Sequence, residues 1–136
     1  MKNRQGLIKL KRFHVDEKRR QVTQIETMLA DFDRMAEELD NQIRQEQERV
    51  GIDDVSHFAY PTFARAAAQR RDNIVNSANE LKDQLSKAQD ELKDAIAELK
   101  KVELMQEREI KRERDALEAI EQDNMDEIAG RYAHRN

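Results

Sequence analysis

An apolar residue recurs at every seventh position between residues 8 and 50. The series is Ile8, Val15, Val22, Leu29, Ala36, Ile43 and Val50. A second position of the same repeat holds Lys11, Lys18, Ile25, Phe32, Leu39 and Glu46. Two such positions in every seven form the apolar seam along which one helix packs against another in a coiled coil. The pattern predicts one long helix over about residues 3–50.

The same repeat returns in the second half of the chain. One position holds Arg71, Ala78, Leu85, Leu92 and Leu99, and its companion holds Ile74, Leu81, Ala88, Ala95 and Val102. The later apolar residues Ile110, Leu117, Ile120 and Ile128 fall out of this phase, as an insertion of four residues into the repeat would produce. No glycine or proline interrupts residues 62–129, so we predict a second, longer helix over about residues 62–130.

These two repeats decide the structural class, because the composition alone is also compatible with disorder. The chain is 40% charged and 4% aromatic, with a mean hydropathy of -1.02. Two long helices with one short connection should fold back on each other. We therefore predict an all-α chain with a single domain over residues 1–136. It forms an antiparallel coiled-coil hairpin with its tip at 51–62 and a C-terminal overhang on the second helix.

Antiparallel packing fixes which residues face each other, because the numbers of facing residues then have a constant sum. The heptad phases permit sums of 110 and 117. The sum of 117 places Ala36 opposite Leu81, a small residue against a large one, and pairs the charges of Glu46 and Arg71. The sum of 110 sets Arg71 against Leu39 instead. We predict the 117 register.

The stretch HFAYPTF at 57–63 contains three of the six aromatic residues and the only proline. In the predicted register it is the hairpin tip, with Pro61 at the start of the second helix. Phe58, Tyr60 and Phe63 could cover the end of the seam or form an apolar patch for a partner. The two roles are compatible.

Charge is distributed unevenly along the chain. Residues 1–20 carry eight bases and two acids, whereas the remaining 116 residues carry 17 bases and 27 acids. Lys11, Lys18 and Gln106 fall in the seam near this end, so the helices should hold each other weakly there. A basic, loosely paired end suits an acidic partner or a membrane surface, although a solvated helix face or a fraying terminus has the same pattern. We expect no nucleic-acid partner, because the rest of the chain would repel phosphate.

No group of residues in the sequence has the spacing of a catalytic or metal site. The three histidines, at 14, 57 and 134, lie far apart, and there is no cysteine. Asp53, Asp54 and His57 share the tip and could hold a metal, but capping the helix is the simpler role. There is no glycine-rich phosphate loop and no run of eighteen apolar residues. We predict a protein that is not an enzyme, has no cofactor or metal and does not span a membrane.

Three stretches carry a family resemblance: RQGLIKLKRFHVDEKRRQV at 4–22, HFAYPTFARAAAQRRDN at 57–73 and ELKKVELMQEREIKRER at 98–114. Their content and order resemble the FliJ family, the small coiled-coil component of the bacterial flagellar type III export apparatus. The resemblance implies a central stalk and regulator of the export ATPase hexamer, with the open end of the hairpin inside the ring. It also implies contacts with the cytoplasmic domain of the membrane export gate and with export chaperones. The expected location is the cytoplasm, at the inner face of the membrane below the flagellum.

The resemblance and the charge pattern together suggest two contact surfaces. Contact with the ATPase ring is assigned to the basic open end, at Arg4, Lys9, Lys11, Arg12, Arg19 and Arg20. Contact with the gate or a chaperone is assigned to the tip, at Phe58, Tyr60, Phe63, Arg65, Arg70 and Arg71.

Three other interpretations stay open at this point. A hairpin factor that inserts two tip acids into RNA polymerase would use Asp53 and Asp54, but this sequence has no residues left for a docking domain. A prefoldin-like chaperone would need β-strands, whose alternating pattern is absent. A structural coiled coil without a specific partner would explain the seam but not the tip or the charge split.

Overall fold

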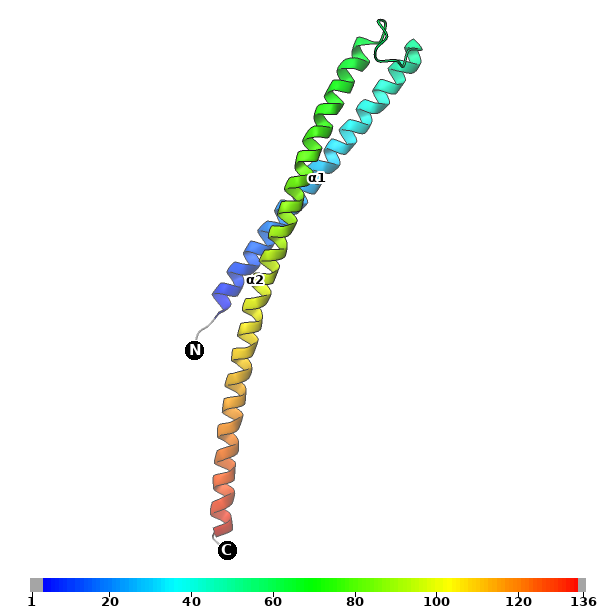
Figure 1. Cartoon of the computed structure of the whole chain (residues 1–136). Helices are drawn as coiled ribbons and strands as arrows, with labels where there is room; N and C mark the ends of the chain where they lie inside the picture. The colour runs from blue at the N-terminus through cyan, green and yellow to red at the C-terminus, as the bar shows by residue number, and fades with distance from the viewer. Residues whose placement is uncertain (1–3, 135–136) are drawn as a thin grey trace. The chain divides into compact units, whose positions relative to one another are not determined.

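The computed structural model describes residues 4–134 and contains two helices (Figure 1). Helix α1 spans Gln5–Val50 and helix α2 spans Thr62–His134. The two helices pack against each other and the second is the longer, which confirms the predicted all-α fold. The predicted start of the first helix at residue 3 lies outside the described residues.

The contacts divide the chain into two compact units, to each of which both helices contribute. The tip unit comprises residues 15–94. The open-end unit comprises, among the described residues, 4–14 of α1 and 95–134 of α2. The two units are described separately below.

The tip unit is held together by apolar packing between α1 and α2. One cluster joins Leu39 and Ile43 to Tyr60, Ala64 and Ala67. Ala64 is fully buried, and such small side chains let two helix backbones approach closely. A second cluster joins Leu29 to Ala78 and Leu81, and three half-buried residues pack against it: Ile25, Phe32 and Leu85. Burial of each large side chain of this kind contributes about 1.5–3 kcal/mol.

The predicted register of the tip unit is wrong. Lys18 forms an ion pair with Glu91, and Arg71 forms one with Asp40. The residue numbers of these pairs add to 109 (18 and 91) and 111 (71 and 40), so the packing follows the 110 register rather than 117. The cluster that holds Leu29 together with Leu81 fits the same register.

The length of the Arg71 side chain explains why the 110 register is tolerated, although it places Arg71 against Leu39. Its guanidinium donates to the carboxylates of Asp40 and Asp72, at 2.8 and 3.2 Å, while the side chain stays half-buried. A long basic residue can thus leave its methylene stem in a seam and carry its charge to the surface. Glu46, the predicted partner of Arg71, pairs instead with Arg49 on its own helix.

Local hydrogen bonds build the loop between the helices. Gly51 closes α1 with a positive φ of 78°, a conformation that glycine adopts without strain, and its N–H donates to the carbonyl of Gln47. The Asp54 carboxylate accepts hydrogen bonds from the backbone N–H and the hydroxyl of Ser56, at 3.0 and 2.7 Å. Pro61 immediately precedes α2, and its carbonyl accepts a hydrogen bond from the N–H of Arg65. The proline thus marks the start of the helix, as predicted.

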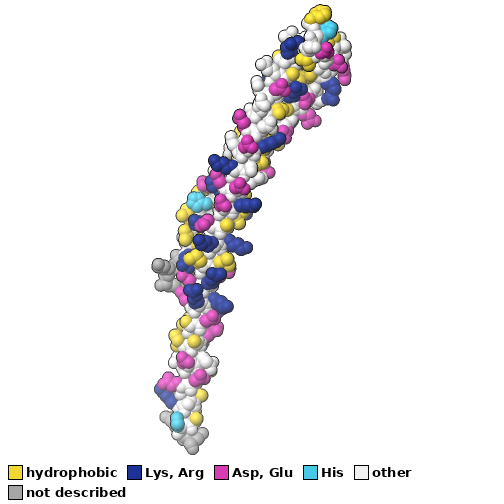
Figure 2. Space-filling model, viewed as in Figure 1, with side chains coloured by type: hydrophobic (Ala, Val, Ile, Leu, Met, Phe, Trp, Pro, Cys, Tyr) yellow, Lys and Arg dark blue, Asp and Glu magenta, His cyan; other side chains and the backbone are white. Residues whose placement is uncertain are grey.

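In the open-end unit α2 extends well beyond the part that α1 covers (Figure 1). Val102 is buried, and Leu99 and Gln106 are half-buried. Every described residue from 111 to 134 is exposed. Apolar side chains remain visible on this part of α2 in the space-filling view (Figure 2). We call residues 111–134 the overhang.

Over residues 4–134, neither helix contains a segment that is long and apolar enough to cross a membrane.

Candidate partner-binding surfaces

Two aromatic rings of the tip are open to a partner. Phe58 is 96% exposed and stacks on the imidazole of His57, with ring centroids 4.7 Å apart and planes inclined by 22°. Phe63, in the first turn of α2, is 56% exposed, and Val55 in the loop is exposed as well. Large apolar side chains gathered at a tip form the kind of patch that a protein partner covers.

The third ring, Tyr60, packs inside the tip. It is buried in the cluster with Leu39 and Ile43, and its hydroxyl accepts a hydrogen bond of 2.9 Å from the side-chain amide of Gln47. The Arg65 guanidinium lies 5.6 Å from the centre of its ring, within the range of a cation–π contact. The two predicted roles of the aromatic residues are therefore divided: Tyr60 closes the seam, whereas the two phenylalanines face outward.

The three arginines assigned to the tip differ in how free they are. Arg65 also donates to the carbonyl of Val55 at 3.2 Å, which ties α2 to the loop. Hydrogen bonding to the carboxylate of Asp40 raises the pKa of Arg71 above its ordinary value, so this residue is engaged within the hairpin. Arg70 is exposed and forms no ion pair with the described residues, so its charge is free for a partner.

At the open end, most of the predicted basic residues are already paired with acids of α2. Within the open-end unit Arg4 pairs with Glu109 at 2.8 Å, Lys11 with Glu98 at 3.6 Å and Arg12 with Glu103 at 3.6 Å. Solvent-accessible pairs of this kind contribute about 0.2–1 kcal/mol each. The ammonium of Lys11 thus reaches a carboxylate of α2 across the seam, and such a solvent-accessible pair is compatible with the predicted weak pairing at this end.

Of the six bases predicted to contact the ring, three are exposed without an ion pair in the described chain. They are Lys9 in the open-end unit and Arg19 and Arg20 in the tip unit. Beside Lys9, Leu10 and Phe13 are about half exposed. This part of α1 therefore offers positive charge together with apolar surface, which suits an acidic partner that also has apolar contact residues.

Gln106 is a weak point of the same end. Its side-chain oxygen is buried and accepts no hydrogen bond. A buried polar atom without a partner costs about 1–3 kcal/mol. The pairing of α1 with α2 near Gln106 is therefore less stable than an apolar seam would make it.

Asp54 and His57 form hydrogen bonds within the loop itself. The carboxylate of Asp54 is held by Ser56, whose hydroxyl lowers the pKa of Asp54, and Nδ1 of His57 accepts a hydrogen bond from the N–H of Ala59. Within residues 4–134, no group of three metal-ligating side chains is close enough to hold an ion.

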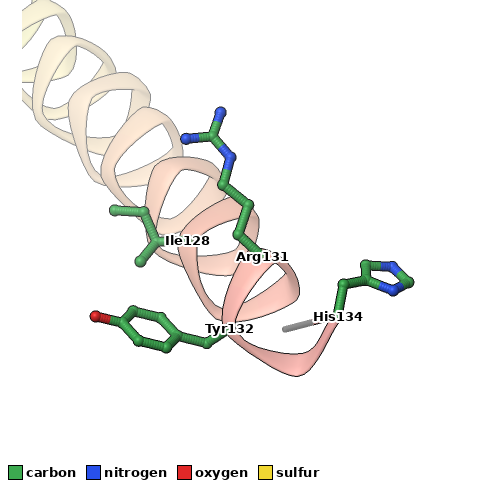
Figure 3. A pocket seen from close by; sticks show the side chains of 4 residues that line it. All are labelled: Ile128, Arg131, Tyr132 and His134. Carbon is green, nitrogen blue, oxygen red and sulfur yellow. The ribbon is translucent and has the colours of Figure 1, made fainter. Parts of the chain in front are cut away.

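A shallow concavity lies at the end of α2 and is lined by Ile128, Arg131, Tyr132 and His134 (Figure 3). All four residues belong to one helix, so the hollow is an open surface between side chains and not an enclosed site. No role was predicted for this region from the sequence. The signal was present there, because exposed Leu117, Ile120, Met125, Ile128 and Tyr132 recur at helical spacing.

Comparison with known proteins gives one family. The family model described as "Flagellar FliJ protein" matches residues 9–136. No curated protein and no solved structure matches this chain. Because the family match covers nearly the whole sequence, the chain belongs to the flagellar FliJ family.

Proposed function

We propose that this chain is a non-enzymatic stalk and regulator of the flagellar export ATPase hexamer. The family match over residues 9–136 carries the proposal, because FliJ proteins are components of the flagellar export apparatus. The fold supports it, since α2 continues as a single helix beyond the start of α1 and so provides a narrow element of the kind that can enter a ring.

The exposed bases of α1 are the residues that we propose for contact with the ring. Lys9, Arg19 and Arg20 have no ion pair in the described chain, so an acidic surface of the ATPase can neutralise them. Arg4, Lys11 and Arg12 belonged to the original assignment, but their charges already stabilise the hairpin. In this proposal they position α1 and contribute less to the partner.

The tip is proposed to contact the membrane export gate or an export chaperone. Phe58 and Phe63 supply apolar surface there, and Arg70 supplies a free charge. Aromatic residues and arginine are the types most enriched at protein interfaces. In this role the chain works in the cytoplasm, next to the inner face of the membrane at the flagellar base.

Sedimentation velocity with the purified export ATPase tests the proposal, with ATP hydrolysis followed in the same samples. We expect one chain to co-sediment with each hexamer and to accelerate hydrolysis. The combined substitutions Lys9→Glu and Arg20→Glu should weaken this association by roughly tenfold or more, because both charges become repulsive.

The matched control reverses two other exposed lysines, Lys82 and Lys93, which lie on α2 in the tip unit. This variant has the same net charge, so it should bind the ATPase like the unchanged chain. Equal losses for both variants would mean that only net charge matters, and the assigned ring surface would be wrong. A chain that leaves the ATPase untouched would contradict the stalk role itself.

A further inference from the structure

Part of the overhang repeats the sequence of the α2 surface on which α1 packs. In the open-end unit that surface contains Leu99, Val102 and Gln106, which face α1. It also contains Glu103 and Glu109, which form the ion pairs with Arg12 and Arg4. The surface thus has an apolar centre and two acids that hold the bases of a neighbouring helix.

The same residue types occur again eighteen residues later. Leu99, Val102, Glu103, Gln106, Glu109 and Ile110 are followed, in the same order, by Leu117, Ile120, Glu121, Asn124, Glu127 and Ile128. Eighteen residues make five full turns of an α-helix, so each residue of the second set lies on the same side of α2 as its counterpart. We call the second set the repeated face.

The repetition is confined to this side of the helix. Leu104, Met105 and Arg108 point away from α1 as exposed residues, and eighteen residues later their positions hold Gln122, Asp123 and Asp126. A general compositional bias would have preserved all positions alike. The sequence therefore repeats a surface rather than a stretch of helix.

Nothing in the described chain covers the repeated face. Leu117, Ile120 and Ile128 are 62%, 57% and 53% exposed. Glu121 forms no ion pair with the described residues, and Glu127 is held only by Arg131 of its own helix, in an exposed pair at 3.3 Å. Such a pair contributes little and can be exchanged for a partner's base at small cost.

The charge around the repeated face indicates what it binds. Residues 115–127 contain six acids and no base. We propose that the repeated face is a docking site for a basic amphipathic helix of a partner protein. That helix lies along α2 as α1 does, with apolar residues against Leu117 and Ile128 and with bases against Glu121 and Glu127. This inference does not depend on the stalk role.

The fitting partner has the pattern seen at the start of α1. There Arg4 and Arg12 are eight residues apart on either side of Ile8, and they reach Glu109 and Glu103. A partner helix with two bases at this spacing and an aliphatic residue between them would satisfy the repeated face. The equivalent segment of a second copy is a weaker candidate, because it is already packed on its own α2.

A fluorescent peptide of residues 4–22 is the probe, titrated with the full-length protein and followed by fluorescence anisotropy. We expect saturable binding that weakens as salt is raised, since the bases of the peptide meet acids. The combined substitutions Leu117→Glu and Ile128→Glu should weaken binding by roughly tenfold or more, because they remove the apolar centre of the face.

The matched control places the same two charges on the opposite side of the overhang, as Ala119→Glu with Gln122→Glu. It should bind the peptide as the unchanged protein does, and circular dichroism should show equal helix content in both variants. Equal weakening by both variants would reduce the effect to charge repulsion and overturn the proposal. So would binding that neither variant affects, because the peptide would then lie elsewhere.

Sedimentation equilibrium of the protein alone separates a second copy from a foreign partner. We expect a monomer whose mass is unchanged by Leu117→Glu with Ile128→Glu. A dimer that these substitutions dissociate would mean that the face binds another copy of the chain, and the partner-helix proposal would be wrong.

Discussion

The tip unit and the open-end unit hold the same two helices together by different means. The tip unit buries Leu39, Ile43, Tyr60 and several alanines between the helices. In the open-end unit Val102 alone is buried among the described residues, and three ion pairs join α1 to α2. Exposed ion pairs contribute much less than buried apolar side chains. The comparison indicates that α1 separates from α2 at a lower cost in free energy in the open-end unit than in the tip unit.

Such a difference suits a chain whose open end engages a partner. Segments with few buried contacts open locally at free energies far below that of global unfolding. The first residues of α1 can therefore rearrange while the tip unit stays folded.

Leu39→Ala should cause the largest loss of stability, and it lies in the tip unit. Leu39 is buried among Ile43, Tyr60 and Ala64, so the shorter side chain leaves a cavity, and we expect a loss of about 2–4 kcal/mol in the free energy of unfolding. Urea unfolding followed by circular dichroism measures this loss. The exposed Leu104→Ala is the control and should cost less than about 0.5 kcal/mol. Comparable losses for both would contradict the assignment of the core to the tip unit.

Gln106→Leu should stabilise the packing of α1 against α2 in the open-end unit. The substitution removes the buried oxygen that has no hydrogen-bond partner and adds an apolar side chain to the seam, so we expect a gain of about 1–2 kcal/mol. The gain should appear as slower hydrogen exchange in α1 at residues 5–14, with little change near the tip. Unchanged exchange there would mean that Gln106 is satisfied in solution.

Tyr60→Phe should weaken the tip by about 1 kcal/mol, because the amide of Gln47 loses the hydroxyl to which it donates. Urea unfolding again gives the number, and Gln47→Leu in the Tyr60→Phe background should restore part of the loss. Phe58→Leu, at a fully exposed ring, should leave stability unchanged and serves as the control. A larger loss for Phe58→Leu than for Tyr60→Phe would reverse the roles given to the two rings.

High salt should weaken the open-end unit more than the tip unit, without any substitution. Raising NaCl from 0.05 to 1 M screens exposed charges, so the three ion pairs of the open-end unit should weaken by about 1 kcal/mol in total. Hydrogen exchange in residues 5–14 should then speed up by roughly fivefold relative to residues 25–45. Equal changes in both segments would mean that the ion pairs do not hold the open end.

The sequence pattern was sufficient for the fold but not for the register. Helix ends at residues 50 and 62 could be predicted because glycine and proline limit helices locally. The heptad phases, however, fit two registers equally well. The choice between them depended on where one long side chain, that of Arg71, could place its charge, and that requires coordinates.

The residue types of the candidate surfaces could be predicted from the sequence. Which of these side chains are exposed and unpaired could not. Tyr60 and Phe58 have similar neighbours in the sequence, and only the folded loop shows that one is buried and the other exposed. Lys11 was expected to weaken the seam because it places a charge at an apolar position. Its partner Glu98 lies far away in the sequence, so the ion pair between them could not be predicted. The repeated face was detectable in principle, since its residues recur after eighteen positions, but its meaning depends on knowing which side of α2 receives α1.

The smallest expected effect is on the pKa of Asp54, in the loop of the tip unit. Hydrogen bonds from the hydroxyl and N–H of Ser56 favour the charged carboxylate and hold the pKa of Asp54 below its ordinary value of 3.8. A lowered pKa in the folded state means that the loop gains stability above about pH 3.8, and that this gain is lost as the pH falls through the lowered pKa. NMR titration of the Asp54 carboxyl carbon should show this lowered midpoint, and Ser56→Ala should move it back toward 3.8. Because Asp54 is fully exposed, the effect should stay within the loop and leave hydrogen exchange in both helices unchanged. A midpoint that Ser56→Ala does not raise would show that the tip loop is not held by this turn. The display of Phe58 would then have to be explained by the packing of Tyr60 alone.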